Sequence, residues 1–519
     1  MFKKIIGMFS AVFVFVLLGS VSGFYFPKKT LASQPKGEVT IAIANTFEMT
    51  GGDTHTIKAG AGAIIKNLLY DSLVTKKSDG RIYPALAKSW QIADDWSQIK
   101  FVLDERAKFH NGQPVTAEDV KFSFERAIRP ELNFIIAGEM KRHIKNVEVL
   151  DKHNLIVHLL KPYPAFFDKC SEYFGIVPKA YVEKVGDAEF AQHPVGAGPF
   201  KAVSFQQDVI FTVEAVKDHY RQPPHVEKLI LKVVPEPATR LAMLKTGEAD
   251  IIQLYPSHIP EIEKNTDLRI QWSKYTMLRT LLFFDLQWPN KPSPWKDIRV
   301  RKAAAYAINS ASITKNILRD AGEPWGDILA PYHPGYDPSI KPYPYNPKKA
   351  KELLAEAGYP KGFDTTLNAS VQFKVQTQAI AADLAKVGIR AKLNIMEHGI
   401  WIKSTVQHKL KGLNNHPTPY WSGRNVVSAL GSTMDPAQKW TVYSTPELEA
   451  QYKKLSVASG LDEQGVEAAK LSKMYREVLP RVNLWAMHVP YGVGKRVKYW
   501  ENVSGWRVAG CFEYLELQE

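Results

Sequence analysis

The sequence predicts an α/β protein with two or three lobes. At 519 residues the chain is longer than a single hydrophobic core usually serves. Apolar residues make up 45% of the chain and aromatic residues 11%, which is enough to build sizeable cores and excludes a disordered protein. In the second half of the chain, segments with the period of helices alternate with segments with the period of strands. This alternation favours helices packed on sheets.

The first 33 residues are interpreted as a targeting segment. Lys3 and Lys4 precede an uncharged stretch, residues 5–26, that is rich in Val, Phe, Leu and Ile, which is the pattern of a secretory signal peptide. The stretch is 22 residues long and therefore also long enough to span a bilayer as an uncleaved anchor. No cysteine precedes Cys170, which excludes lipoprotein attachment here. We expect a periplasmic protein, with residues 1–33 acting as a signal peptide or an N-terminal anchor.

The first elements after this segment are a strand and a helix. Apolar residues alternate over residues 39–43, as in a half-buried strand. Residues 45–55 are polar and contain glycine, which is typical of a loop. Residues 64–74 carry apolar side chains at helical spacing.

Residues 101–128, FVLDERAKFHNGQPVTAEDVKFSFERAI, predict a strand, a turn and a helix in succession. Apolar residues alternate at the start, and His110-Asn111-Gly112 then indicates a turn, because Asn and Gly tolerate a positive φ. Thr116 is placed to cap the helix, and acidic residues follow it in the first turn. Nothing in the stretch sets a nucleophile beside a base, so its residues predict a packing unit without chemistry of its own.

The alternation continues through the rest of the chain. Residues 194–200, PVGAGPF, contain a Gly-x-Gly that we interpret as a turn, because a phosphate cradle needs a helix directly after it and a strand pattern follows. The other predicted elements are a hairpin over 147–159, a strand–helix–strand unit over 229–252 in which Gly247 ends the helix, helices over 297–318, 347–357 and 376–387, and strands over 389–395 and 512–517.

The chain is basic, with 67 Lys and Arg against 53 Asp and Glu and a formal net charge of +14. Nucleic-acid binding is one interpretation, but the basic residues are scattered and form no basic helix or RNA-binding motif. We prefer a surface or pocket that favours anions.

Covalent and metal chemistry find little support in the sequence. Cys170 and Cys511 are the only cysteines, and they are either a disulfide or two buried thiols. The 14 histidines are scattered, His416 among them, and no Cys/His spacing of a metal site occurs. Neither Gly-x-Ser-x-Gly nor His-Glu-x-x-His is present, so we expect a protein without catalytic activity, metal or cofactor.

Several segments together carry a resemblance. Residues 101–128, 194–200, 238–252 and 297–318 resemble, in the same order, segments of the family 5 extracellular solute-binding proteins, the peptide/nickel-type receptors of ABC importers. The resemblance covers about residues 36–519. It implies a type II periplasmic-binding-protein-like fold in which ligand is trapped between lobes I and III as they close about a hinge. The implied lobes are lobe I over 36–68, 197–277 and 490–519, lobe II over 69–196 and lobe III over 278–489.

The resemblance also implies where ligand binds. In peptide-binding members a lobe III loop, after a Trp-containing strand, carries a carboxylate that holds the α-amino group of the peptide. The matching residues here are Tyr420, Trp421, Arg424 and Asn425, and Arg424 stands where that acid would be. A guanidinium repels an ammonium group but grips a carboxylate with two parallel N–H bonds. The alternatives are that Arg424 pairs with an internal acid or that the alignment is shifted by one residue.

Other residues are expected at the same cleft. Phe47 and Glu48, in the loop after the first strand, match a region that contacts ligand in the family. Trp401 and Trp421 either line the cleft or pack in a core. Arg279 lies near the crossover between lobes I and III, where it adds a second positive group.

The resemblance implies a receptor that captures peptides or a related small organic solute and delivers it to an inner-membrane ABC permease. Arg424 raises the alternative of a non-peptide, acid-bearing solute. A secreted hydrolase and a membrane-anchored sensor or chaperone are the competing classes. We expect a monomer that binds no nucleic acid, while a metal chelated by a small carrier molecule remains compatible with the sequence.

Overall fold

The computed structural model describes residues 34–44, 49–58, 62–77, 80–419, 424–435, 438–458, 460–501 and 511–519. Residues 34–519 form one compact unit, so the boundaries of the three lobes stay a prediction. The signal peptide or anchor predicted over residues 1–33 lies outside the described residues. Within the described residues, no helix is both long and apolar enough to pass through a membrane.

An eleven-stranded sheet runs through most of this unit, in the order β15-β14-β16-β12-β17-β11-β1-β10-β9-β8, with β13 paired to β17. Each half of the sheet has parallel strands at its centre. In one half β1 pairs in parallel with β10 and β11, and in the other β14 pairs in parallel with β15 and β16. The strands are β1 (Glu38–Ile43), β8 (Phe200–Gln206), β9 (Ile210–Ala215), β10 (Lys228–Val233), β11 (Ile251–Gln253), β12 (Leu268–Phe283), β13 (Gly322–Pro324), β14 (Phe363–Ser370), β15 (Ile389–Met396), β16 (Leu413–Pro419) and β17 (Arg481–Gly494).

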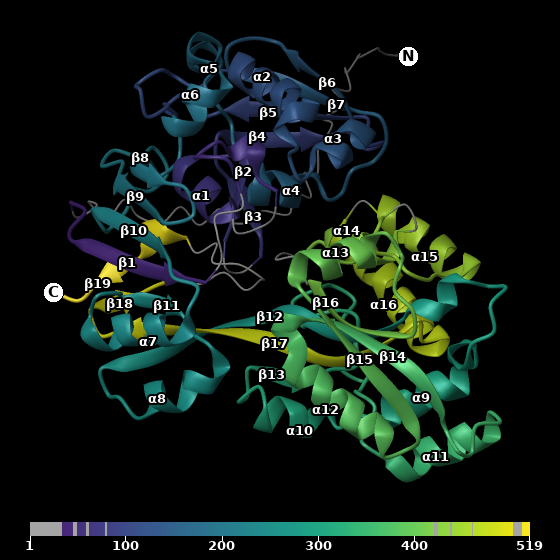
Figure 1. Cartoon of the computed structure of the whole chain (residues 1–519). Helices are drawn as coiled ribbons and strands as arrows, with labels where there is room; N and C mark the ends of the chain where they lie inside the picture. The colour runs from purple at the N-terminus through teal and green to yellow at the C-terminus, as the bar shows by residue number, and fades with distance from the viewer. Residues whose placement is uncertain are drawn as a thin grey trace, which may run out of the picture. The chain divides into compact units, whose positions relative to one another are not determined.

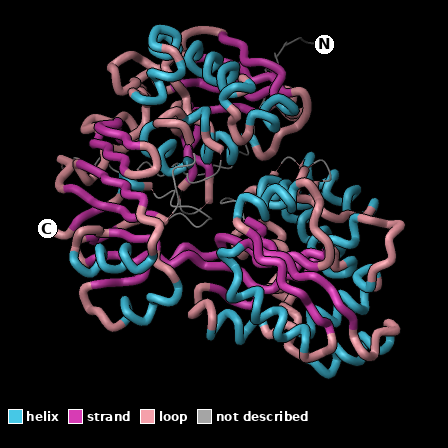
Figure 2. The backbone as a smooth tube through the Cα atoms, in the orientation of Figure 1, coloured by secondary structure: helices cyan, strands magenta, loops and turns pink. Residues whose placement is uncertain are grey.

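The long antiparallel strands β12 and β17 connect the two halves of this sheet (Figure 1). Figure 2 shows them as two neighbouring extended segments that run from one half to the other. Their pairing is interrupted between Ser273 and Met277, and Tyr275 in this interval has a φ of 52°. The register shifts again between Arg279 and Thr280. Because an interruption of the hydrogen-bond ladder lets strands bend, we expect the two halves to move relative to each other at the first of these breaks.

A second sheet has the order β4-β5-β7-β6 and contains the strand predicted at residue 101. Its strands are β4 (Ala87–Ile92), β5 (Gln98–Leu103), β6 (Ile144–Val149) and β7 (Asn154–Leu159), with the short strands β2 (Val74–Lys76), β3 (Ile82–Pro84), β18 (Val497–Tyr499) and β19 (Glu516–Leu517) forming two further pairs. The predicted turn is confirmed, since Gly112 has a φ of 83° and its N–H donates to Phe109 O at 2.8 Å. Thr116 and Asp119 form the capping box that begins α2 (Ala117–Ala127).

The remaining helices pack around these sheets. They are α1 (Gly62–Leu69), α3 (Ala137–His143), α4 (Phe166–Tyr173), α5 (Lys179–Val185), α6 (Asp187–Gln192), α7 (Pro237–Thr246), α8 (Ile259–Glu263), α9 (Ile298–Ala307), α10 (Ser310–Asn316), α11 (Pro347–Glu356), α12 (Lys374–Ala385), α13 (His398–Val406), α14 (Val426–Met434), α15 (Pro446–Val457) and α16 (Leu461–Val478). Cys170 and Cys511 are both buried and unpaired, so the alternative of two buried thiols is the correct one.

Three of the predicted elements are wrong in extent, among them the helix over residues 64–74, since α1 ends at Leu69. The helix predicted over residues 297–318 is divided into α9 and α10, because Asn309 caps the second helix by accepting the Ser312 N–H at 2.9 Å, while its own N–H donates to Asp383. The C-terminal strand predicted over residues 512–517 is mostly a 3-10 turn, Phe512–Tyr514, and only β19 is extended.

The Gly-x-Gly at residues 196–198 lies in an irregular segment that is followed by strand β8, as the turn interpretation predicted, and it also packs closely on the end of α1. A Cβ at Gly196 would lie 1.9 Å from the carbonyl oxygen of Leu69, so only glycine fits. The Gly198 N–H donates to that same oxygen at 2.9 Å. The helix predicted over residues 64–74 therefore ends at Leu69, where its last carbonyl is bound by the 196–198 segment.

The sequence predicts His110 only as a turn residue, but in the structure it also binds the glycine segment at residues 196–198. Its Nδ1 accepts the Gly196 N–H at 3.2 Å, and its Nε2–H donates to Gly198 O at 3.1 Å, so the ring is neutral and fastens the glycine segment. Burial lowers the pKa of His110 to about 4. In the unfolded chain the pKa of His110 is about 6.5. Between pH 6.5 and pH 4, His110 is therefore protonated in the unfolded chain and neutral in the folded protein.

Because of this difference, the free energy of unfolding should fall as the pH drops from about 6.5 through 4. One pKa unit corresponds to about 1.4 kcal/mol, so His110 accounts for a loss of about 3 kcal/mol over that interval. Denaturant unfolding between pH 7 and pH 4.5 measures it. The slope should be smaller in His110→Gln and unchanged in the control His193→Gln, since the His193 side chain is 69% exposed. Equal slopes in all three proteins would contradict the assignment.

Candidate ligand-binding site

The candidate site lies at the edge of the large sheet where three parallel strands end. Strands β14, β15 and β16 run in parallel and finish at Ser370, Met396 and Pro419. In open α/β sheets, ligands bind at the carboxyl ends of parallel strands, because helices begin there and present their N-terminal N–H groups. Helices α12, α13 and α14 begin after these strands. The crossing strand β12 reaches the same edge, with Met277 opposite Pro419.

Arg424 and Asn425 lie between β16 and α14. Asn425 caps α14, since its Oδ1 accepts the Ser428 N–H at 3.0 Å, and its Nδ2 donates to Pro164 O at 2.7 Å. Arg424 is half-buried. Within the described ranges no acid lies in ion-pair distance of Arg424, in contrast to exposed arginines such as Arg390, which pairs with Asp364. Its role as a ligand contact stays a prediction.

Arg279 is fully buried on β12 at this edge. Its guanidinium carbon lies 3.8 Å from the ring centroid of Phe373, and within the described residues its hydrogen bonding is limited to a weak contact with the sulfur of Met277 at 3.9 Å. Nε and Nη1 have no partner among the described residues. Burial lowers the pKa of Arg279 to about 9, so the side chain is still a cation at neutral pH.

A second buried arginine lies near it, on β17. Arg481 donates to Thr418 Oγ1 at 3.1 Å and to Thr433 Oγ1 at 3.4 Å. His416, opposite Thr280 in the β12–β16 pair, is buried, and its pKa falls to about 3 through burial and then through the charges of Arg481 and Arg279. The edge therefore carries two guanidinium groups and a neutral imidazole, which favours a negatively charged ligand group.

Two tryptophan side chains lie beside His416. The ring centroids of Trp401 and Trp440 each lie 5.5 Å from that of His416. Trp401 is 2% exposed, and its Nε1–H donates to Asn414 Oδ1 at 2.9 Å. Trp401 therefore packs inside this half of the structure, and its contact with ligand stays a prediction.

The structure brings Arg279 and Trp401 to one edge, with Arg424 and Asn425 in the loop beyond β16. Four other predicted ligand contacts, Phe47, Glu48, Tyr420 and Trp421, lie outside the described residues. Arg481 and Phe373 were not predicted from the sequence, and His416 was not expected to take part in binding an anion. One feature of the sequence could have identified Arg481. It is a charged residue at the start of a strand, RVNLWAMHVPYGVG, whose other residues are uncharged apart from His488. In the part of the chain that the structure describes, no group of three His, Cys, Asp or Glu can hold a metal ion.

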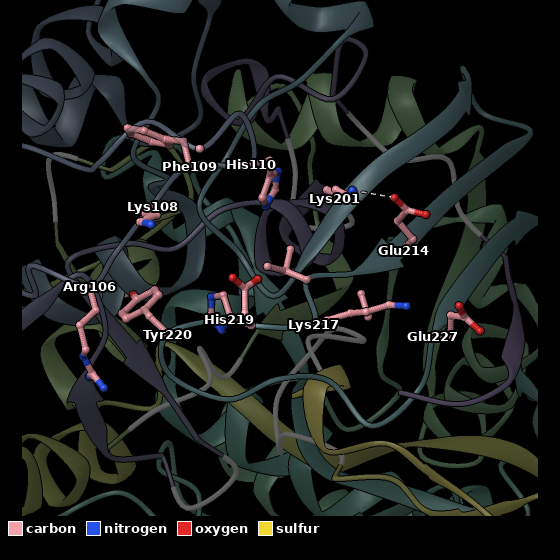
Figure 3. Close-up of a pocket in the computed structure, with 14 residues that line it drawn as sticks. Arg106, Lys108, Phe109, His110, Lys201, Glu214, Lys217, His219, Tyr220 and Glu227 are labelled. Carbon is pink, nitrogen blue, oxygen red and sulfur yellow. Dashed lines mark ion pairs between the residues drawn. The ribbon is translucent and has the colours of Figure 1, made fainter. Parts of the chain in front are cut away.

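A pocket of about 660 Å³ lies elsewhere, next to the turn at residues 110–112 (Figure 3). Its lining mixes charges, and Lys201 pairs with Glu214 at 2.8 Å. His110 and His219 both lie in it, but each is hydrogen-bonded to a backbone carbonyl, of Gly198 and Ala197. Because its cations are paired or exposed, this pocket is a weaker candidate than the buried edge of β14–β16.

Comparison with known proteins gives matches along most of the chain. Residues 81–423 match the sequence model of the "Bacterial extracellular solute-binding proteins, family 5 Middle". The chain is 29% identical over 462 residues, 82% of each chain, to heme-binding protein A of Haemophilus influenzae. It is 30% identical over 370 residues, 70% of each chain, to glutathione-binding protein GsiB of Escherichia coli O1:K1 / APEC.

The structure is also similar to a solved one. This is the ABC transporter-associated periplasmic binding protein DppA from Helicobacter pylori in complex with peptide STSA. The TM-score is 0.79 at 24% identity, and the match covers 94% of this chain and 99% of that chain.

Proposed function

Because the chain belongs to the bacterial extracellular solute-binding proteins of family 5, we propose that it captures a small acid-bearing organic solute for an ABC importer. The predicted fold class, α/β of the type II periplasmic-binding-protein kind, is confirmed by the similarity to solved members. Both curated relatives are named as binding proteins rather than enzymes. The solute is bound without covalent chemistry and passed to a permease in the inner membrane.

The observation that carries this proposal is the cationic edge of the β14–β16 sheet. Arg279 is a buried cation, Arg424 is a half-buried one, and neither pairs with an acid in the described residues. Heme and glutathione, which give the two curated relatives their names, both carry carboxylate groups. A ligand with a carboxylate group compensates the positive charges of Arg279 and Arg424, whereas the ammonium end of a peptide is repelled by Arg424.

The location and partners follow from the same proposal. The protein acts in the periplasm as a monomer, after residues 1–33 have directed its export. Ligand lies between lobe I (36–68, 197–277 and 490–519) and lobe III (278–489), and the break in the β12–β17 pairing allows the closure. Neither nucleic acid nor a bound cofactor is needed.

Native mass spectrometry of protein purified gently from its own secretion compartment tests the proposal. The mass lost on denaturation should be that of one small acid. A ladder of peptide masses would instead indicate a general peptide receptor, and turnover of a chromogenic ester or peptide would indicate a hydrolase. The observed N-terminus distinguishes a cleaved signal peptide from a retained anchor.

Arg424→Ala should weaken the binding of that acid by about 1.5–3 kcal/mol, the range for a hydrogen bond to a charged group. Isothermal titration calorimetry with the solute identified by mass spectrometry measures the change. Arg390→Ala is the control, because its side chain is 54% exposed and pairs with Asp364. Unchanged affinity in a folded Arg424→Ala protein would remove Arg424 from the site.

A further inference from the structure

The buried arginines of this chain show how it normally satisfies a guanidinium group. Arg301, 6% exposed, donates to the carbonyl oxygens of four residues, Trp295, Lys296, Val478 and Leu479. Arg240, 2% exposed, donates in the same way to carbonyl oxygens of Val234, Pro235 and Gln253. These two arginines stabilise the fold, because each of them forms hydrogen bonds to the backbone of more than one segment.

Arg279 differs from both. It is 0% exposed, yet among the described residues it has no oxygen or nitrogen acceptor at all. Burying an unpaired cation is strongly unfavourable. A folded protein retains such a group where a ligand completes its bonding, as in binding sites that reduce the stability of the free protein.

The surroundings of Arg279 favour a negative charge. Its guanidinium stacks on Phe373, the residue that precedes the first turn of the 12-residue helix α12. No side chain caps this helix, and its first turn contains no acid. The N-terminus of a helix attracts anions through its free N–H groups and its dipole. Burial is the cause of the lowered pKa of Arg279, and none of the described residues forms an ion pair with it.

The planar geometry of the guanidinium group favours a carboxylate as its partner. Nε and Nη2 lie on one side of a guanidinium and can donate to the two oxygens of a carboxylate in parallel. Among the residues that the structure describes, Nε of Arg279 has no partner, and Nη2 has only the contact to the Met277 sulfur. The neighbouring Asn415, which faces the same side of the sheet, also has a buried oxygen without a partner in the described chain.

We propose that Arg279 and the start of α12 bind a carboxylate group of the transported solute. This assignment rests on the proposed function and adds the chemical group that the site recognises. Arg279 lies two residues beyond the break between Ser273 and Met277, in the same half of the sheet as Phe373 and Asn415, so these groups stay together when β12 and β17 bend there. Closure then encloses the ion pair, which makes the pair strong because water is excluded.

The experiment compares Arg279→Met with the matched control Arg301→Met. Met has a volume similar to that of the arginine stem and removes the charge. Ligand-free protein, prepared by dialysis in denaturant and refolding, should have an unfolding midpoint in Arg279→Met at least as high as in wild type. Arg301→Met should be less stable, because the carbonyl groups of four residues, two of them in fully buried bonds, lose their donor. Equal losses in the two variants would show that Arg279 is structural and overturn the proposal.

Sodium formate serves as the smallest carboxylate probe, compared with sodium chloride at equal ionic strength. Formate should raise the thermal midpoint of wild type and of Arg301→Met but not that of Arg279→Met. The next probes are glutathione and hemin with their carboxylate esters. The affinity of a bound acid form should fall about 10- to 100-fold in Arg279→Met, and wild type should bind the ester as weakly as the variant binds the acid. No formate effect in wild type, or the same effect in Arg279→Met, would overturn the assignment.

Native mass spectrometry of the two variants separates this inference from the proposed function. If Arg279→Met carries the same acid as wild type at the same occupancy, the assignment of Arg279 is wrong and the receptor function stands. If wild type carries no solute and binds none of the probes, the receptor function fails, and so does the assignment that rests on it. If wild type carries an acid that Arg279→Met has lost and Arg301→Met has kept, both are supported.

Discussion

Arg126→Met should lower the free energy of unfolding by about 3–5 kcal/mol, the loss expected when one partner of a buried ion pair is removed. The side chain of Arg126 is fully buried in α2 and donates to both carboxylate oxygens of Asp53, at 3.0 and 2.6 Å. It also donates twice to Asp187, at 3.0 and 2.8 Å. The variant would leave the carboxylate of Asp53, 1% exposed, without its cation.

His55 belongs to the same network and adds to the loss. Its Nε2–H donates to Gly175 O at 3.0 Å, so its Nδ1 is the acceptor for Arg126 at 3.0 Å. The ring is therefore neutral, and its pKa lies well below the ordinary value because of burial and then the charge of Arg126. Removal of Arg126 leaves this nitrogen without a donor as well.

Urea unfolding followed by circular dichroism measures the change, with Arg106→Met as the control. Arg106 pairs with Asp104 at 2.6 Å, but its side chain is 70% exposed, so its loss should be below about 1 kcal/mol. Similar losses in the two variants would mean that burial does not determine the strength of these pairs. Residues 53–56 are joined to α2 and α6 by this network, so we also expect faster proteolysis of that segment in Arg126→Met.

The second large effect is expected at Trp401. Trp401→Ala should lower the free energy of unfolding by about 3–5 kcal/mol, because it removes a fully buried indole and leaves a cavity. The ring stacks on His398 at a centroid distance of 5.8 Å and an interplanar angle of 18°. The variant also deprives Asn414 Oδ1 of its donor, and Asn414 Nδ2 already lacks a partner in the described chain.

Trp401→Phe distinguishes packing from ligand contact at this position. If the indole only packs, the free energy of unfolding falls by less than in Trp401→Ala and ligand affinity is unchanged. A weaker affinity with little loss of stability would place Trp401 in the wall of the ligand cleft. Trp288→Ala is the control for both measurements, because its ring is partly exposed beside Lys291 and should cost clearly less stability.

The strand, turn and helix at residues 101–128 were predictable because each depends on neighbours in the sequence. Gly112 supplies the positive φ and Thr116 with Asp119 supplies the cap, and both are local effects. The prediction that Arg424 replaces an acid of the family's ligand-binding loop also came from one position in the sequence, and it stays a prediction. The division of residues 297–318 into two helices was missed, because it depends on Asp383, which binds the Asn309 N–H from 74 residues away.

The sequence by itself determined the α/β class, the family and the cationic character of this protein, since periodicity, motif order and charge are properties of the chain. Only the tertiary structure decided which charges are paired. Arg279 and Arg301 look alike in the sequence, yet Arg301 donates to four carbonyl oxygens, whereas Arg279 has no such acceptor among the described residues. His110 looked like a turn residue until folding placed it against Gly196 and Gly198. The physical reason is that the free energy of a buried polar group depends on the partners that distant segments bring to it.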